Sequence, residues 1–297
     1  MRGYRNQDSA RQKQKALPMT VLRKMHEIAT SKRDQAVVWL LTGAIFFAMR
    51  SCEYLKTAPE ESKRTKIIRV GNIRFKKGNS VVNHDHPNLH SSDLVRITFK
   101  FQKNDERDVS IHMFRSGDKT LCPVIAWATT VKRVRAIQEA SNDSPVCLFR
   151  EDKGTTTMLT AMYARSRLRA TVQLMGGQKL GFTELDIGLH SIRSGGAMAM
   201  FLSGVPVVVI MRVGRWSSDA FLEYIRDQIE SFTAEVSKKM ITCEDFVNLN
   251  MQTSQMAPQD TTQDGETLPQ NENGHNSVTF NVHFTKLALG RRKRQQR

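Results

Sequence analysis

The sequence predicts an α+β fold that is mainly α, with a small antiparallel β-sheet inserted among the helices. Apolar residues recur with helical spacing on both sides of residues 67–113, whereas within that stretch apolar and polar residues alternate as in half-buried strands. With 297 residues, of which 39% are hydrophobic, the chain is long enough to bury one good-sized core. We therefore expect one principal domain over residues 17–248.

Two helices are expected before the sheet. The first opens at Leu17-Pro18 and is amphipathic; its apolar face consists of Val21, Leu22, Met25 and Ile28. The second, from about Asp34 to Arg50, is nearly all apolar and should lie inside the domain. Its apolar run, residues 36–49, is too short to span a bilayer comfortably, so we expect no membrane association.

The alternating stretch predicts three strands joined by polar turns. Strands are expected over residues 67–75, 95–101 and 109–113, the middle one with strict alternation. The turns are expected at residues 76–79 and 103–108, which are rich in Lys, Asn, Gly and Asp.

After Cys122-Pro123 the helical pattern returns. Helices are expected at about residues 123–139, 158–175, 189–203 and 205–212, with a break at Gly204 and with Pro206 in a first helical turn. Further helices should carry Tyr224 and cover residues 232–248.

Both ends of the chain differ in composition from this domain. Residues 1–16 are polar and basic and are expected to be a lead-in or linker, whereas residues 249–297 are expected to be a disordered tail. Within that tail, residues 251–276 hold four acids and no Lys or Arg, and residues 290–297 form a basic cluster. The cluster is typical of a nuclear import signal, a phosphate-binding arm or a plain solvated tail, and we expect a nuclear protein.

Charge and cysteines narrow the classes of partner. The formal net charge of +16 attracts polyanions, of which nucleic acid is the first candidate. The four cysteines show no paired metal spacing and are typical of reduced thiols in a cytosolic or nuclear protein. His84, His86 and His90 are close enough in sequence to bind zinc, but their Pro-, Asn- and Ser-rich surroundings favour a surface loop. We expect neither a metal nor a cofactor.

One set of residues points to phosphoryl transfer. Tyr224 is one of only four tyrosines, and His190 and Arg193 share one face of a helix start some thirty residues upstream. Arg50 is expected to end the apolar helix, and Glu53 is three residues later. A tyrosine hydroxyl with such cations could attack a phosphate, because cations stabilise the developing charge. Each pair alone also has a purely structural interpretation. Arg50 and Glu53 could be an ion pair within a helix, and His190 and Arg193 could be ordinary core or surface residues.

In combination, these motifs resemble the catalytic domain of the tyrosine recombinases, the phage-integrase class. The order is Arg, a hairpin Lys, His-x-x-Arg, Gly-x-Trp and Tyr, and the resemblance covers residues 17–248. The stretches Leu-His-Ser-Ile-Arg-Ser-Gly-Gly-Ala (residues 189–197) and Gly-Arg-Trp-Ser-Ser-Asp-Ala-Phe-Leu-Glu-Tyr-Ile-Arg (residues 214–226) are most similar to Crypton-type recombinases of eukaryotic mobile elements.

The resemblance implies roles for particular residues. The catalytic set is Arg50, Lys103, His190, Arg193, Trp216 and Tyr224, with Tyr224 as nucleophile and with Glu53 and Arg215 in support. Three points stay open. Counting back from Tyr224 selects Arg215 instead of Trp216, Lys100 is the alternative to Lys103, and His190 could donate a proton or accept one.

The implied function is that of the catalytic domain of a site-specific DNA recombinase or integrase. It would cleave and rejoin double-stranded DNA through a 3′-phosphotyrosine without metal or ATP, and would self-associate on DNA, possibly through residues 232–248. One rival is a relaxing enzyme similar to type IB topoisomerases. Another is a recombinase-derived DNA-binding protein that is catalytically idle, since only about sixteen residues stand where the family carries an N-terminal DNA-clamping domain.

Overall fold

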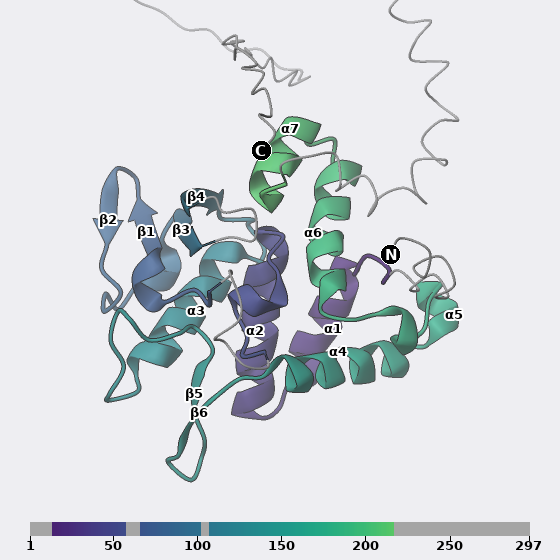
Figure 1. Cartoon of the computed structure of the whole chain (residues 1–297), viewed down its shortest axis with the longest axis horizontal. Coiled ribbons are helices and arrows are strands. Elements are labelled where there is room, and N and C mark those ends of the chain that lie inside the picture. Colours follow the sequence, from purple (N-terminus) through teal and green to yellow (C-terminus); the bar gives the residue numbers. More distant parts are fainter. Residues whose placement is uncertain (1–13, 58–65, 102–106, 217–297) are drawn as a thin grey trace, which may run out of the picture. The chain divides into compact units, whose positions relative to one another are not determined.

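Helices and short antiparallel strands make up the computed structural model, which describes residues 14–57, 66–101 and 107–216 (Figure 1). All of these belong to one structural unit. The α-helices are α1 (Met19–Ile28), α2 (Lys32–Phe46), α3 (Pro123–Arg135), α4 (Ala161–Met175), α5 (Gly177–Leu180), α6 (His190–Leu202) and α7 (Val207–Gly214). Short 3₁₀ turns are η2 (Ser51–Glu53), η4 (Val70–Asn72), η5 (Leu89–Ser91) and η6 (Glu184–Asp186). The predicted mixed, mainly α class is confirmed.

The main sheet has four antiparallel strands in the order β2-β1-β3-β4. They are β1 (Ile73–Lys77), β2 (Ser80–Val82), β3 (Leu94–Phe101) and β4 (Arg107–Phe114). The predicted antiparallel sheet is thus confirmed, but its first strand begins at Ile73 and not at Ile67. The preceding amides bond elsewhere, that of Ile68 to the Glu53 carbonyl at 2.8 Å and that of Val70 to the Ser144 carbonyl at 2.9 Å.

A second sheet was not predicted from the sequence. Strands β5 (Leu148–Arg150) and β6 (Thr156–Met158) form a short hairpin that Figure 1 shows projecting away from the larger sheet. Three-residue strands are too short for the alternation of apolar and polar residues to be recognised.

The end of α2 also differs from the expectation. The helix ends at Phe46, and Arg50 lies beyond it as the residue that precedes η2. Ala48 has a left-handed backbone with φ +42°, and the Met49 amide donates back to the Ala44 carbonyl at 3.0 Å. The chain therefore turns sharply between the buried helix and Arg50, which the continuous apolar run did not reveal.

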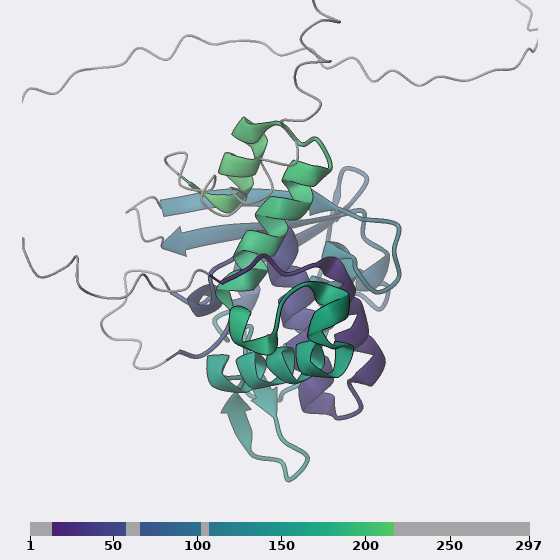
Figure 2. The ribbon, with the colours of Figure 1, turned by 90° about the vertical axis from the view of Figure 1, so that its right-hand side faces the viewer.

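At the other helix break, Gly204 separates α6 from α7 as predicted, with φ +73°. Pro206 precedes α7 as its N-cap and does not lie in its first turn. Figures 1 and 2 both show α7 beside the C-terminal part of α6.

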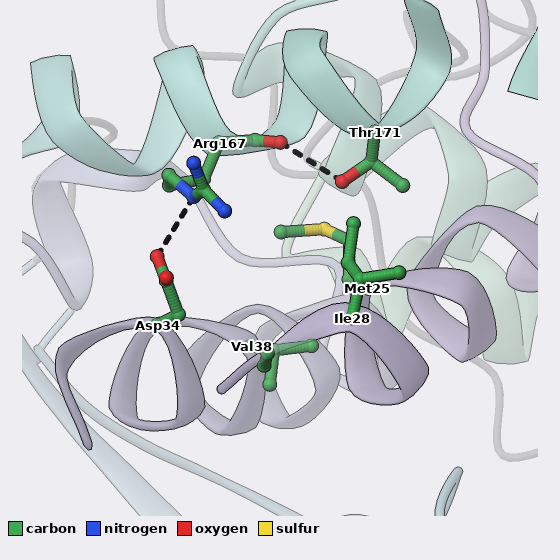
Figure 3. Close-up of a pocket in the computed structure, with 7 residues that line it drawn as sticks. Met25, Ile28, Asp34, Val38, Arg167 and Thr171 are labelled. Atoms are coloured by element: carbon green, nitrogen blue, oxygen red, sulfur yellow. Dashed lines mark hydrogen bonds and ion pairs between the residues drawn. The ribbon is translucent and has the colours of Figure 1, made fainter. Parts of the chain in front are cut away.

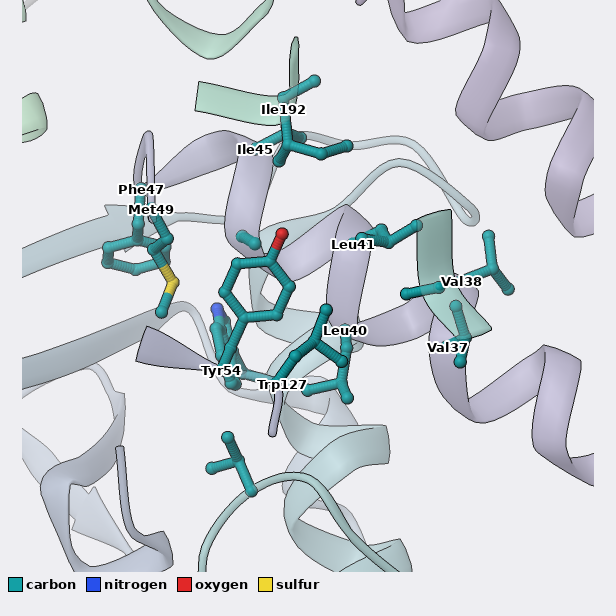
Figure 4. Packing of buried hydrophobic residues seen from close by; sticks show 14 of the residues in the cluster. Val37, Val38, Leu40, Leu41, Ile45, Phe47, Met49, Tyr54, Trp127 and Ile192 are labelled. Carbon is teal, nitrogen blue, oxygen red and sulfur yellow. The ribbon is translucent and has the colours of Figure 1, made fainter. Parts of the chain in front are cut away.

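The core is built around α2, which contacts α1, α3 and α6 (Figure 1). Figure 4 shows Leu40, Leu41 and Ile45 of this helix around the buried ring of Tyr54, with Trp127 of α3 nearby. A Cβ at Gly43 would lie 2.8 Å from the Trp127 indole, so glycine at this position lets α3 approach α2. Helix α3 also contacts β3 and β4 and so joins the sheet to the helices.

Two glycines bring the first half of α6 against other backbone: Gly196 against the end of α2, and Gly195 against the segment that precedes α1. A Cβ at Gly196 would lie 2.2 Å from the Ile45 carbonyl oxygen, and one at Gly195 would lie 2.4 Å from that of Leu17. Both contacts are with backbone, which cannot move aside as a flexible side chain can. This close packing places His190 and Arg193 of α6 next to the turn that leads to Arg50.

Several expectations concern residues outside the described part. These are the helices around Tyr224 and over residues 232–248, the domain limit at residue 248 and the tail of residues 249–297. At the other limit, the Lys15 amide donates to the Asp186 carbonyl at 2.9 Å, and the division between lead-in and domain stays a prediction. Among the described helices, none combines the length and apolar character needed to cross a bilayer.

Candidate active site

Arg50 and Glu53 form a compact pair around η2. The Arg50 amide donates to Glu53 Oε2 at 2.9 Å, and its Nη1 donates to Glu53 Oε1 at 3.3 Å. The Arg50 side chain is 23% exposed and that of Glu53 only 1%. The plain structural pairing left open by the sequence is therefore formed, and it leaves one edge of the Arg50 side chain accessible from solvent.

Glu53 also binds a second arginine, Arg215. The distance from Arg215 Nη2 to Glu53 Oε2 is 2.7 Å, and the Arg215 side chain is fully buried. Arg215 Nη1 donates to the Phe47 carbonyl at 3.2 Å, and its guanidinium lies 3.6 Å from the centre of the Phe99 ring. This one side chain therefore joins the turn after α7 to η2, to the end of α2 and to β3.

Arg193 is buried as well, with 1% of its surface exposed. Its Nη1 donates to the Ala48 carbonyl, a residue 145 positions away, and its Nη2 donates to the Gly214 carbonyl at 2.6 Å. The Trp216 ring covers the guanidinium, with 4.2 Å from Cζ to the ring centre. A Cβ at Gly214 would come within 1.6 Å of that indole, so Trp216 can take this place because residue 214 is glycine.

His190 is the first residue of α6 and is exposed. The surrounding protein desolvates its ring and thereby lowers the pKa of His190, and the positive charges of Arg193 and Arg50 lower that pKa further. Arg193, one helical turn after His190, donates to the carbonyl of Ala48, which is two residues before Arg50, so the three groups belong to one part of the structure. A lowered pKa keeps His190 neutral at pH 7, when one ring nitrogen can accept a proton.

The structure thus brings together six of the eight site residues, one of which is Glu53. Arg50, His190, Arg193, Arg215 and Trp216 come from α6 and from the turns that follow α2 and α7. Among the described residues of this region, three arginines stand against the one carboxylate of Glu53, which leaves an excess of positive charge. Such a region favours an anion, because the cations are held in place by burial and by backbone carbonyls before any ligand arrives.

The two remaining site residues, Lys103 and Tyr224, lie outside the described residues. The alternative lysine, Lys100, is near the end of β3, and its ammonium pairs with Asp108 at 2.7 Å. The choice between Trp216 and Arg215 stays open, because Trp216 covers Arg193 whereas Arg215 binds Glu53.

Sequence reasoning missed the groups that hold these side chains. The carbonyls of Ala48 and Gly214 and the ring of Phe99 contact the two buried arginines. The alternation in residues 95–101 indicated that Phe99 would be buried, but carried no signal for an arginine against it. The left-handed backbone at Ala48 had no sequence signal at all, because such a conformation normally favours glycine.

A small pocket elsewhere takes no part in this arrangement. It lies between α1, α2 and α4, and Figure 3 shows Asp34 and Arg167 at its edge with Met25 and Val38 in its wall. Arg167 Nε pairs with Asp34 at 2.7 Å, and the Tyr163 hydroxyl donates to the same carboxylate at 2.9 Å. Its polar groups therefore already bind each other.

The histidine loop is likewise engaged in other contacts. His84 Nε2 lies 2.8 Å from the Ile73 carbonyl, and His90 Nε2 lies 3.1 Å from Thr129 Oγ1. Among the described residues, no three His, Cys, Asp or Glu side chains lie close enough together to hold a metal ion.

Comparison with known proteins gives similarity at the level of solved structures only. No protein-family profile and no curated protein matches the chain. It is similar to the XerH site-specific recombinase bound to its difH substrate before cleavage, with 15% identity and a TM-score of 0.46 over 84% of this chain and 57% of that one. It is also similar to XerH bound to palindromic difH substrate in the post-cleavage complex, with 15% identity and a TM-score of 0.49 over 78% of this chain and 56% of that one.

A third similar structure is the Tn1549 transposon integrase in complex with circular intermediate DNA. Its identity is 12% and its TM-score 0.38, over 73% of this chain and 62% of that one. The chain spans somewhat more than half the length of the XerH chains that it matches. With TM-scores below 0.5, these similarities carry no argument about activity.

Proposed function

We propose that this chain is the catalytic domain of a site-specific recombinase, which cleaves and rejoins double-stranded DNA through Tyr224. The observation that carries the proposal is the convergence of Arg50 with His190 and Arg193, which are far from it in the sequence: Arg193, one turn after His190 on α6, donates to the Ala48 carbonyl two residues before Arg50. Together with the order of motifs up to Tyr224, that convergence supports a phosphate as the shared ligand.

The proposed reaction is a transesterification. The Tyr224 oxygen attacks a backbone phosphorus, the bond from that phosphorus to the 5′-oxygen breaks, and a 3′-phosphotyrosine forms. Lys103 gives a proton to the departing 5′-oxygen, and the tyrosine proton passes to His190 or to solvent. One phosphodiester replaces another, so the step needs no ATP, and rejoining is its reversal.

The arginines stabilise the negative charge that grows on the phosphate oxygens. Arg50 is the one with an accessible edge, and Glu53 fixes its position. Arg193 binds two backbone carbonyls and is covered by Trp216, so in our proposal it fixes the turns after α2 and α7 and adds positive charge to the site. Arg215 sets the turn from which the segment carrying Tyr224 departs.

Three finer parts of the proposal have support from the sequence alone. The sequence similarity of residues 189–197 and 214–226 supports a Crypton-type mobile-element recombinase, and the basic residues 290–297 support nuclear import. The apolar stripe along residues 232–248 supports self-association on DNA.

A nicked suicide substrate tests the central claim. The nick lets the 5′-hydroxyl fragment diffuse away after cleavage, so that the covalent protein–DNA adduct accumulates and can be counted on a denaturing gel. We expect an adduct with the full chain and none with Tyr224→Phe. The matched control is Tyr163→Phe, which removes a hydroxyl that binds Asp34 and should leave the adduct unchanged.

The second candidate is a recombinase-derived protein that binds DNA without cutting it. The burial of Arg193 favours it, because two of its N–H groups are occupied by backbone carbonyls and its surface is 1% exposed. Retained DNA binding without any adduct, on substrates of several sequences, would favour this reading over the first.

A further inference from the structure

We propose that the outer face of the four-stranded sheet is a second contact surface for the DNA backbone, separate from the candidate active site. The surface centres on Arg74, Arg96 and His112, which we call the basic row. Arg74 of β1 is directly opposite Arg96 of β3, and Arg96 is directly opposite His112 of β4. Residues paired in this way point to the same face of a sheet.

All three members of the basic row are exposed, whereas their neighbours along each strand are buried or half-buried. On β3, for example, Val95 and Ile97 flank Arg96 and belong to the core. The alternation therefore fixes the basic row on the side of the sheet that faces away from the helices.

The row does not help the fold. Like charges directly opposite each other on neighbouring strands are destabilising. Within the described residues, neither Arg74 nor Arg96 forms an ion pair. Two exposed acids close by are already engaged, since Asp85 pairs with Arg135 at 3.0 Å and Asp108 pairs with Lys100 at 2.7 Å.

The charge of Arg74 also affects a neighbouring histidine, His84. Burial lowers the pKa of His84, and the positive charge of Arg74 lowers it further. Lys76, two positions along β1 on the same face as Arg74, enlarges the basic area. The next rung is polar, with Thr98 Oγ1 and Ser110 Oγ 2.8 Å apart.

The dimensions fit a stretch of backbone. Neighbouring strands are about 4.8 Å apart, so the row is about 10 Å long. Duplex DNA carries one negative charge per about 1.7 Å of its axis, so several phosphates pass within reach of such a row. Contacts to phosphates position DNA but carry no sequence information, so we expect binding through the basic row to be independent of sequence.

The row cannot serve the same phosphate as the active site. Phe99, which contacts Arg215, is three positions from Arg96 on β3 and so lies on the opposite face. The basic row would therefore hold a different segment of DNA from the one that is cut. The identity of the partner as DNA rests on the proposed function, but the charge argument for a polyanion does not.

The test compares two double variants of the full chain that lose the same formal charge. Arg74→Ser with Arg96→Ser disrupts the row, and Arg150→Ser with Lys153→Ser is the control in the β5–β6 hairpin. The affinity for a random-sequence duplex is measured by fluorescence anisotropy over a range of salt concentrations. Each phosphate contact contributes about 0.9 to the slope of log K against log salt, so we expect the row variant to reduce that slope by about 1.8 and the control to leave it nearly unchanged.

Three outcomes would overturn the inference. The first is an equal salt slope for the row variant and the control variant, and the second is a full chain that does not bind DNA. The third concerns polyglutamate, a polyanion without phosphates, as a second ligand: the row variant would lose its binding to polyglutamate but keep its binding to DNA. Thermal unfolding checks that the row variant is folded, and we expect no loss of stability because a repulsion is removed. The suicide-substrate adduct is measured in parallel. If the wild type forms none, the proposed activity fails, while the salt slopes still decide the basic row.

Discussion

Replacing Glu53 by Gln should destabilise the protein strongly, because it leaves a buried arginine without its counter-ion. Arg215 is fully buried and lies 2.7 Å from the Glu53 carboxylate, whose side chain is 1% exposed. Removing one partner of such a pair costs about 3–5 kcal/mol, since the remaining charge stays desolvated. A domain is typically stable by about 5–15 kcal/mol, so Glu53→Gln should remove a large part of the total.

The measurement is urea unfolding followed by tryptophan fluorescence, at neutral pH. The matched control is Glu27→Gln, which removes an exposed carboxylate that pairs with Lys24 and should cost less than about 1 kcal/mol. The double variant Glu53→Gln with Arg215→Met removes both buried charges, so it should recover much of the stability lost in the single variant.

The reasoning would be refuted if Glu53→Gln unfolded at the same urea concentration as Glu27→Gln. It would be refuted as well if Arg215→Met added its own full cost to that of Glu53→Gln, because independent costs would mean that the two side chains do not interact.

Three more predictions concern separate parts of the molecule. Gly196→Ala should destabilise by about 1–3 kcal/mol in urea unfolding, because the new Cβ would lie 2.2 Å from the Ile45 carbonyl. Burial lowers the pKa of His26 to about 4, so the folded state favours the neutral ring. The free energy of unfolding should therefore be highest above pH 6.5 and fall as the pH drops towards 4. In a pH series of urea unfolding, the wild type should lose up to about 3 kcal/mol more than His26→Gln over that range. In the suicide-substrate assay, Lys103→Ala should slow adduct formation by about 10²–10⁴-fold, whereas an equal effect of Lys100→Ala would favour the alternative lysine.

The sequence by itself determined most of the architecture. Helix α1 includes all the apolar positions from Val21 to Ile28 that predicted it, and β3 covers the alternating residues. The break at Gly204 was equally visible. These features depend on short-range periodicity, which reports which side of an element is buried and needs no knowledge of what covers it.

The sequence also selected Arg50, His190 and Arg193 as a group, because they follow in the order of a known set of motifs. What it could not supply was their surroundings. Arg50 was expected at the end of a helix and instead follows a sharp turn: the helix ends at Phe46, four residues early, and Ala48 beyond it has a left-handed backbone. The short β5–β6 hairpin was missed because too few residues repeat in it.

Only the tertiary structure decided which charges are buried and what they bind. Nothing local marks Arg215 as the partner of Glu53, 162 positions away, or Arg193 as a donor to the Ala48 carbonyl. Gly196 lets α6 pack against the end of α2, and Gly195 lets it pack against the segment before α1, so that Arg193 can reach the turn that follows α2. A chain's periodicity fixes its elements one at a time, whereas the environment of a charge depends on the packing of all the elements around it.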